Sequence, residues 1–165
     1  MKQPLELLLT TLLHKETTMP SNYERTYGVN TVSASTLTVT PGGYVGQPII
    51  LSAAGAQTVT LPAASGSGNK YTFIGSADAT GDHKIQVANA SDIMMGIAVL
   101  GNDAAGASCF YTADTSDTIT LNGSTKGGYK GWRVTLIDIA ANTWQVEVVS
   151  EASGTEATPF SAAVS

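Results

Sequence analysis

The sequence predicts an all-β protein, a β-sandwich or jelly-roll-like domain preceded by an extended N-terminal arm. Three observations indicate this class. Short runs of alternating apolar and polar residues recur along the chain, Gly-, Pro- and Asn-rich turn signals separate them, and no helical periodicity interrupts residues 36–150. At 165 residues the chain is long enough to bury a core.

The composition argues against nucleic acid and a membrane as partners of this chain. Hydrophobic residues make up 42% of the chain, which argues against global disorder, and charged residues only 13%, about half the usual share of ~25%. The net charge is −5 and no basic cluster is present, so nucleic acid is not an expected partner. No apolar run approaches the ~18 residues of a membrane-spanning helix, so a membrane is not expected either. The low charge suits a subunit of an assembly.

Residues 1–35 are expected to form the N-terminal arm. Within them, residues 1–18 leave three interpretations open. Helical spacing of the leucines predicts a short amphipathic helix at 5–14; the residues concerned are Leu5, Leu8, Leu9, Leu12 and Leu13. A signal peptide would explain Lys2 before an apolar run, but Glu6 interrupts that run and no A-x-A site follows. Alternatively, Met19 is the natural start and the preceding residues are an upstream extension.

Residues 19–35 have neither helical nor strand periodicity and are expected to be extended. They carry Tyr23, Arg25 and Tyr27, residue types that are enriched at interfaces. A segment that cannot pack a core alone but bears such side chains is suited to ordering on a partner. These three residues are therefore candidate partner-binding residues.

The domain proper is expected at residues 36–150 and contains ten candidate strands. Turn signals such as Pro41-Gly42-Gly43, Asn122-Gly123 and Gly127-Gly128 separate them. The strands are Thr36–Thr40, Pro48–Ala53, Thr58–Leu61, Tyr71–Gly75, Lys84–Ala88, Ile93–Leu100, Ser108–Ala113, Thr118–Leu121, Trp132–Ile139 and Thr143–Ser150. No repeat of fixed period is found.

The last two strands are expected to pair as an aromatic hairpin at the centre of the fold. Trp132 and Trp144 each begin an alternating apolar series, so each series lies on one strand face. Residues Ala140 to Thr143 fit a tight connection in which Asn142 adopts a left-handed conformation. Pairing would bury both tryptophans on one side of the sheet.

Two further segments flank this hairpin. Residues 123–131, GSTKGGYKG, are predicted to form a flexible hairpin tip, and Tyr129 beside Lys126 and Lys130 is a fourth candidate partner-binding residue. Residues 151–165 form a small, polar C-terminal tail, expected to be a second arm or a final edge strand. The order of residues in 123–131 is not that of a phosphate-binding loop.

Catalytic and metal-binding signals are weak. Residues 76–83 alternate oxygen-bearing side chains, but Gly and Glu do not fall where a calcium loop needs them. Cys109 and His83 could formally make a Cys–His pair. Cys109 lies in the strand SCFYTA, where a core thiol is expected, and His83 borders a turn. We therefore expect a protein that is not an enzyme, with no catalytic residue, metal or cofactor.

Four segments together resemble the capsid decoration (cement) proteins of tailed bacteriophages and related small virion structural proteins. They are Thr58–Ala64, Ser116–Gly123, Asp138–Trp144 and Ala157–Ser161. The resemblance covers roughly residues 30–165. It implies a β-sandwich or jelly-roll subunit, often a homotrimer, on the capsid surface of the virion. There it would bridge neighbouring subunits of the major capsid protein.

An alternative function remains, a fibre- or adhesin-type domain that recognises a host surface glycan. Such a domain would be expected to expose several aromatic side chains on loops. Here most aromatic residues fall in candidate strands or in the arm, which favours the structural function.

Overall fold

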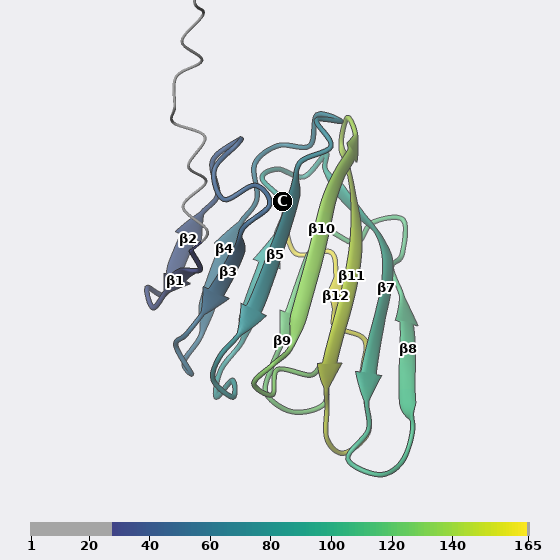
Figure 1. Cartoon of the computed structure of the whole chain (residues 1–165). Coiled ribbons are helices and arrows are strands. Elements are labelled where there is room, and N and C mark those ends of the chain that lie inside the picture. Colours follow the sequence, from purple (N-terminus) through teal and green to yellow (C-terminus); the bar gives the residue numbers. More distant parts are fainter. Residues whose placement is uncertain (1–27, 165) are drawn as a thin grey trace, which may run out of the picture.

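The computed structural model describes residues 28–164, which form twelve strands in two facing sheets (Figure 1). In spatial order, the seven-stranded sheet contains β1 (Asn30–Val32), β3 (Pro48–Leu51), β5 (Lys70–Gly75), β10 (Arg133–Ala140), β11 (Thr143–Glu151), β7 (Ile93–Gly101) and β8 (Ala107–Tyr111). The five-stranded sheet contains β12 (Phe160–Ser161), β9 (Thr118–Leu121), β6 (His83–Gln86), β4 (Gln57–Thr60) and β2 (Thr36–Thr38).

The prediction of an all-β fold is confirmed, since residues 28–164 contain no helix. All ten predicted strands are present. The sandwich also extends beyond the expected limits of residues 36–150. Strand β1 lies within the segment expected to be the arm, and β12 makes the C-terminal tail a final edge strand paired with β9. The helix expected at 5–14 lies outside the described residues.

The first six strands alternate between the two sheets as the chain winds forward. Strands β1, β3 and β5 pair in parallel in one sheet, and β2, β4 and β6 pair in parallel in the other. Parallel neighbours need a long connection, and here the strand in the opposite sheet supplies it. This winding differs from the antiparallel Greek keys of a jelly roll. Asn30 pairs with Ile49, whereas Pro48 pairs with Thr72. The number of residues between one strand and its parallel neighbour therefore differs from strand to strand, and the sequence has no fixed period.

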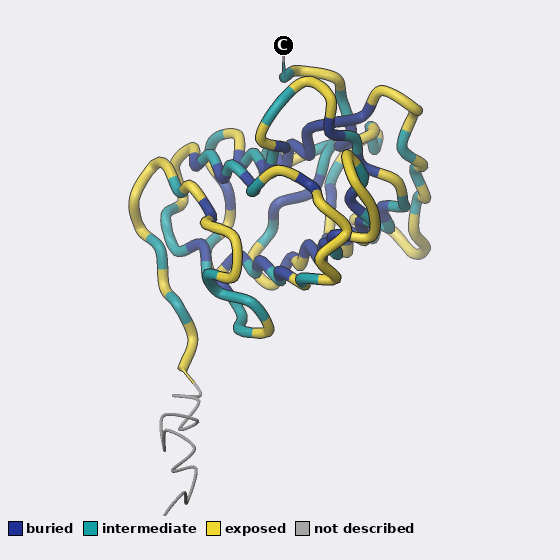
Figure 2. The backbone as a smooth tube through the Cα atoms, turned by 90° about the horizontal axis from the view of Figure 1, so that it is seen from above, coloured by how far each residue is buried: buried dark blue, intermediate teal, exposed yellow. Residues whose placement is uncertain are grey.

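The predicted aromatic hairpin is confirmed. Strands β10 and β11 pair antiparallel, and Asn142 at their turn has a φ of 61°. Trp132 and Trp144 are 1% and 0% exposed and belong to one core between the sheets. Figure 2 shows the buried segments on the inner sides of both layers. The hairpin therefore supplies the two largest side chains of the core.

The prediction of a core position for Cys109 was wrong, whereas His83 begins β6 directly after the bend at residues 80–81, as expected. Cys109 is exposed, because Phe110 takes the inward position on β8 and alternation turns Cys109 outward. His83 is 1% exposed, because it shares the inward face of β6 with Ile85. Its ring packs edge-on against Trp132 with centroids 5.9 Å apart, and neither ring nitrogen has a hydrogen-bond partner.

Residues 123–131 are not a hairpin tip, since they connect β9 in one sheet to β10 in the other. The segment is also packed against the body of the sandwich. Gly128 is buried; its N–H donates to Ser150 Oγ and its carbonyl accepts from Ala79 N–H. Lys130 N–H donates to Asp78 Oδ1 at 2.8 Å. Asp78, part of the calcium-like segment 76–83, thus anchors this connection.

Candidate interaction surface

Of the four partner-binding residues predicted from the sequence, the structure describes one, Tyr129. Tyr23, Arg25 and Tyr27 lie outside the described residues. Tyr129 is half-buried, and its hydroxyl donates to Ser153 Oγ at 3.0 Å. Tyr129 therefore links the connection 123–131 to the segment that follows β11.

An apolar surface that the sequence analysis did not identify covers the outer face of β7 and β8 and reaches Val149 on β11. Strand register places its side chains in rows. Val149 lies beside Val99, which lies beside Cys109, and in the next row Ile97 lies beside Tyr111. Directly paired residues point to the same side of a sheet, so these rows form one continuous patch. We call it the outer β7–β8 face; its members are Met95, Ile97, Val99, Cys109, Tyr111 and Val149.

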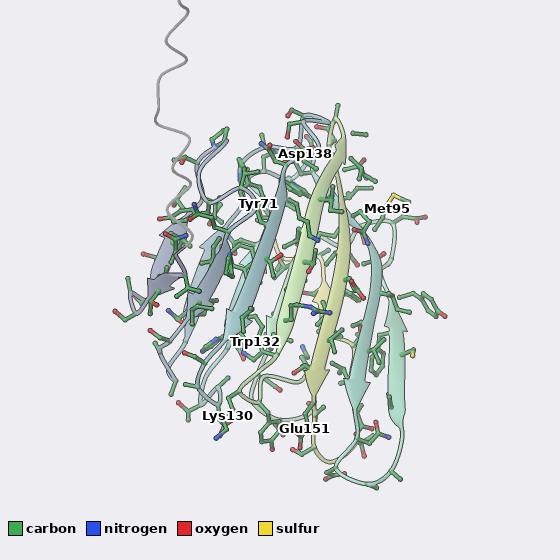
Figure 3. All side chains as sticks on the ribbon, viewed as in Figure 1. Tyr71, Met95, Lys130, Trp132, Asp138 and Glu151 are labelled. Atoms are coloured by element: carbon green, nitrogen blue, oxygen red, sulfur yellow. The ribbon has the colours of Figure 1, made fainter. Side chains whose placement is uncertain are left out.

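The outer β7–β8 face is open to solvent. Tyr111 is 75% exposed and Met95 is 53% exposed, so neither is shielded by neighbouring strands. Figure 3 shows the Met95 side chain at the surface of the sheet near the β7–β8 edge. Exposed apolar side chains are ordinary when scattered singly, but a contiguous group is typical of an interaction site.

Polar side chains border the outer β7–β8 face on its β11 side, where Arg133 also lies beside Val149. Gln145 and Glu147 on β11 lie beside Met95 and Ile97, at the boundary of the face. Strand β8 itself, Ala107–Tyr111, contains no charged residue. Burying an apolar centre inside a polar boundary is how protein interfaces are commonly built.

An unbroken apolar run in the sequence corresponds to the outer β7–β8 face. The run Ile93–Leu100, IMMGIAVL, is apolar at both alternating positions. Such a run is typical of a strand buried on both sides. In the described structure the inner side packs in the core through Met94 and Ala98, whereas nothing in residues 28–164 covers the outer side at Met95.

Strand β8 is also a sheet edge. It pairs with β7 and with no other described strand, so one side of its backbone is unpaired. Unpaired N–H and C=O groups along an edge can accept a further strand from another chain. The edge and the apolar face adjoin, so one partner could cover both.

The most strongly hydrogen-bonded charge lies at another end of the sandwich. Asp138, 2% exposed, accepts hydrogen bonds from the backbone of residues 65–67 and from both serine hydroxyls there. The shortest are from Ser67 Oγ at 2.6 Å and Gly66 N at 2.7 Å. Burial, the largest influence, raises the pKa of this carboxyl, but the hydrogen bonds outweigh it and lower the pKa from 3.8 to about 2. The Asp138 carboxylate holds the loop 65–69 in place.

Residues 28–164 show neither a metal-binding cluster nor a membrane-spanning helix. Residues 28–164 hold no group of three or more His, Cys, Asp or Glu side chains that could bind a metal ion. They also include no helix with the length and apolar character of a membrane span. Comparison with known proteins finds no protein family that matches the chain and no match among curated proteins.

Proposed function

We propose that this chain is a structural virion protein of a tailed bacteriophage that decorates and stabilises the capsid. It would bridge neighbouring subunits of the major capsid protein from the outside of the shell, as a homotrimer. The observation that carries the proposal is the outer β7–β8 face, an apolar surface continuous with an unpaired edge strand. The resemblance of residues 30–165 to capsid decoration proteins supplies the class of partner.

An isolated subunit leaves the outer β7–β8 face and the β8 edge uncovered. Closed symmetry hides exposed apolar faces and sheet edges within an oligomer. Covering the outer face would bury Tyr111 and Met95, residues of types that are enriched at interfaces. Low overall charge, 13% of residues, weakens the repulsion between neighbouring copies.

The alternative function, recognition of a host glycan by exposed loop aromatics, has less support on this surface. Among residues 28–164 the one exposed aromatic side chain is Tyr111, and it lies on strand β8. Tyr44 and Tyr129, on connections between strands, are half-buried.

The primary test is to purify particles and count copies of the protein per particle. A decoration protein is expected at a fixed copy number that matches the capsid symmetry, and it should be released before the major capsid protein under mild denaturation. Absence of the chain from intact particles would refute the proposal.

A variant test addresses the surface itself. Tyr111→Ser and Met95→Ser should each leave the melting temperature nearly unchanged while weakening attachment roughly tenfold, since truncating an interface anchor costs about 1–2 kcal/mol. Ile139→Ser is the matched control, because Ile139 is 50% exposed but lies on β10, outside the outer β7–β8 face. Equal particle occupancy for all three variants and the unmodified chain would exclude the outer β7–β8 face as the contact.

A further inference from the structure

The hydrogen bonds at the two ends of the β7–β8 ladder fix which backbone groups of β8 are free. At one end Asn102 N–H donates to the Gly106 carbonyl, and at the other Thr112 N–H donates to the Gly96 carbonyl, both at 3.1 Å. Along an antiparallel ladder, hydrogen-bonded pairs alternate with pairs that are not hydrogen-bonded. Every second residue of β8 between these two ends therefore bonds to β7.

The residues of β8 that bond to β7 are Ser108 and Phe110, which occupy the hydrogen-bonded positions of the ladder. The N–H and C=O groups of Ala107, Cys109 and Tyr111 point the other way. On that side the described part of the chain contributes no further strand, and Figure 1 shows β8 as the outermost strand of its sheet. Alternate residues that offer both a donor and an acceptor form the backbone pattern that accepts an added strand.

Two copies of β8 complement one another. When two copies run antiparallel about a two-fold axis at Cys109, Cys109 faces Cys109 of the second copy, and Ala107 of each copy faces Tyr111 of the other. All of these pairs join residues whose N–H and C=O groups are free, so each becomes a hydrogen-bonded pair. A register displaced along the strand leaves some of the free groups unpaired within β8. The register centred on Cys109 therefore uses the whole edge.

Charge does not oppose this pairing. Residues 104–113 contain no Asp, Glu, Lys or Arg, so two antiparallel β8 strands bring no like charges opposite each other. The same stretch contains no Pro, another common protection of sheet edges. On the outer face Tyr111, 75% exposed in the single chain, would lie beside the small Ala107 side chain of the second copy. Pairing thus covers part of the most exposed large apolar side chain in residues 28–164.

We propose that two copies of this chain pair through their β8 strands, antiparallel and centred on Cys109, and so join their seven-stranded sheets into one. The outer β7–β8 faces of the two copies then adjoin on one side of the joined sheet and stay free for a capsid. The contact is self-complementary and joins two copies, which are either free chains or members of two neighbouring trimers. It does not rest on the capsid function, since it forms between copies of the purified chain.

The size of the contact sets its strength. Strand β8 contributes five residues from each copy. Such a contact falls among the small, transient interfaces that bury less than ~1,200 Å². The free chain should therefore pair at high concentration, and copies held close together on a particle should pair more completely.

Cross-linking of the purified full chain tests the contact. The probe is 1,2-bis(maleimido)ethane, which forms a thioether with each of two nearby thiols. Facing residues of a hydrogen-bonded pair have Cα atoms ~5.5 Å apart, so Cys109 should be linked to Cys109 of a second copy. The control is Cys109→Ser combined with Ile139→Cys, because Ile139 is exposed but lies on β10. At the same protein concentration this control should give roughly tenfold less covalent dimer.

Two further variants in the Cys109→Ser background test the register. A mixture of Ala107→Cys and Tyr111→Cys should give covalent dimer, because these two residues face each other across the contact. Neither variant should do so alone, since two copies of residue 107 are separated by roughly 14 Å along the strands. Both positions are exposed, so the melting temperature of each variant should stay close to that of the unmodified chain.

The proposal is overturned if the unmodified chain sediments as a monomer up to millimolar concentration, or if the Ile139→Cys control is linked as readily as Cys109. It is also overturned if the mixture of Ala107→Cys and Tyr111→Cys gives no more dimer than either variant alone, which would indicate another register. None of these outcomes concerns attachment to particles. The capsid function stands or fails separately, on the presence of the chain in intact particles.

Discussion

Replacing the buried carboxylate of Asp138 tests how the loop 65–69 is held. Asp138→Asn keeps the size of the side chain but exchanges one acceptor oxygen for an amide that donates hydrogen bonds. That amide would face the N–H and O–H groups of Ser65 and Ser67, which need acceptors. We expect the free energy of unfolding at pH 7 to fall by about 2–4 kcal/mol, since donors buried beside one another lose their charge-assisted partner.

The effect of pH follows from the pKa. The Asp138 carboxyl is lowered from 3.8 to about 2 on folding, which corresponds to about 2 kcal/mol of stability. Because folding lowers this pKa, the contribution is fully present above pH 3.8 and is lost as the pH falls through about 2. Other carboxylates titrate in the same range, so only the difference between the unmodified chain and Asp138→Asn isolates this group.

The measurement is urea unfolding followed by tryptophan fluorescence at a series of pH values from neutral to about 2. The unmodified chain should lose about 2 kcal/mol more than Asp138→Asn over this range. Asp114→Asn is the control, because Asp114 is exposed, and it should follow the unmodified chain. Equal losses for the unmodified chain and Asp138→Asn would show that the Asp138 carboxylate does not stabilise the loop.

Three further predictions follow from the packing. Trp144→Ala should lower the free energy of unfolding by about 3–5 kcal/mol, because it removes a fully buried side chain and leaves a cavity; solvent-exposed fluorescence from both native tryptophans would contradict this. Gly75→Ala would place a Cβ 1.9 Å from Trp132 Nε1 and should cost about 1–3 kcal/mol, whereas Gly55→Ala meets nothing within 4 Å and should be neutral in the same denaturation assay. Cys109→Lys puts a charge at the centre of the β8 edge and should reduce self-association in analytical ultracentrifugation, while Cys109→Ser should not; equal association of the two variants would argue against this edge.

The strands were predictable because their signals are local. Alternation and turn residues located all ten expected strands, including the hairpin with Asn142 at its turn. Strand β1 was missed and β12 was expected only as one of two alternatives for the tail, because three and two residues are too short to show a period. The exchange between sheets was missed because pairing of Asn30 with Ile49 depends on distant residues.

The candidate sites were harder to predict, for a different reason. Alternation shows that Cys109 and Phe110 point to opposite sides of a strand, but not which side faces the core when both are apolar. Tyr71 of β5 packs beside Trp144 of β11 across the intervening β10, with ring centroids 5.8 Å apart, a neighbourhood that sheet order alone creates.

The four edges of the two sheets explain why one side of the molecule is suited to a partner. Strands β1, β2 and β12 are edges of only two or three residues, and very short edges are a common protection against unwanted pairing. The fourth edge, β8, has five residues, carries no charge and continues the exposed apolar surface of β7. An edge of this kind without protection is a hazard for a protein that remains alone, because it invites association. Its persistence beside three protected edges is consistent with a chain whose working state covers β8 with a neighbouring subunit.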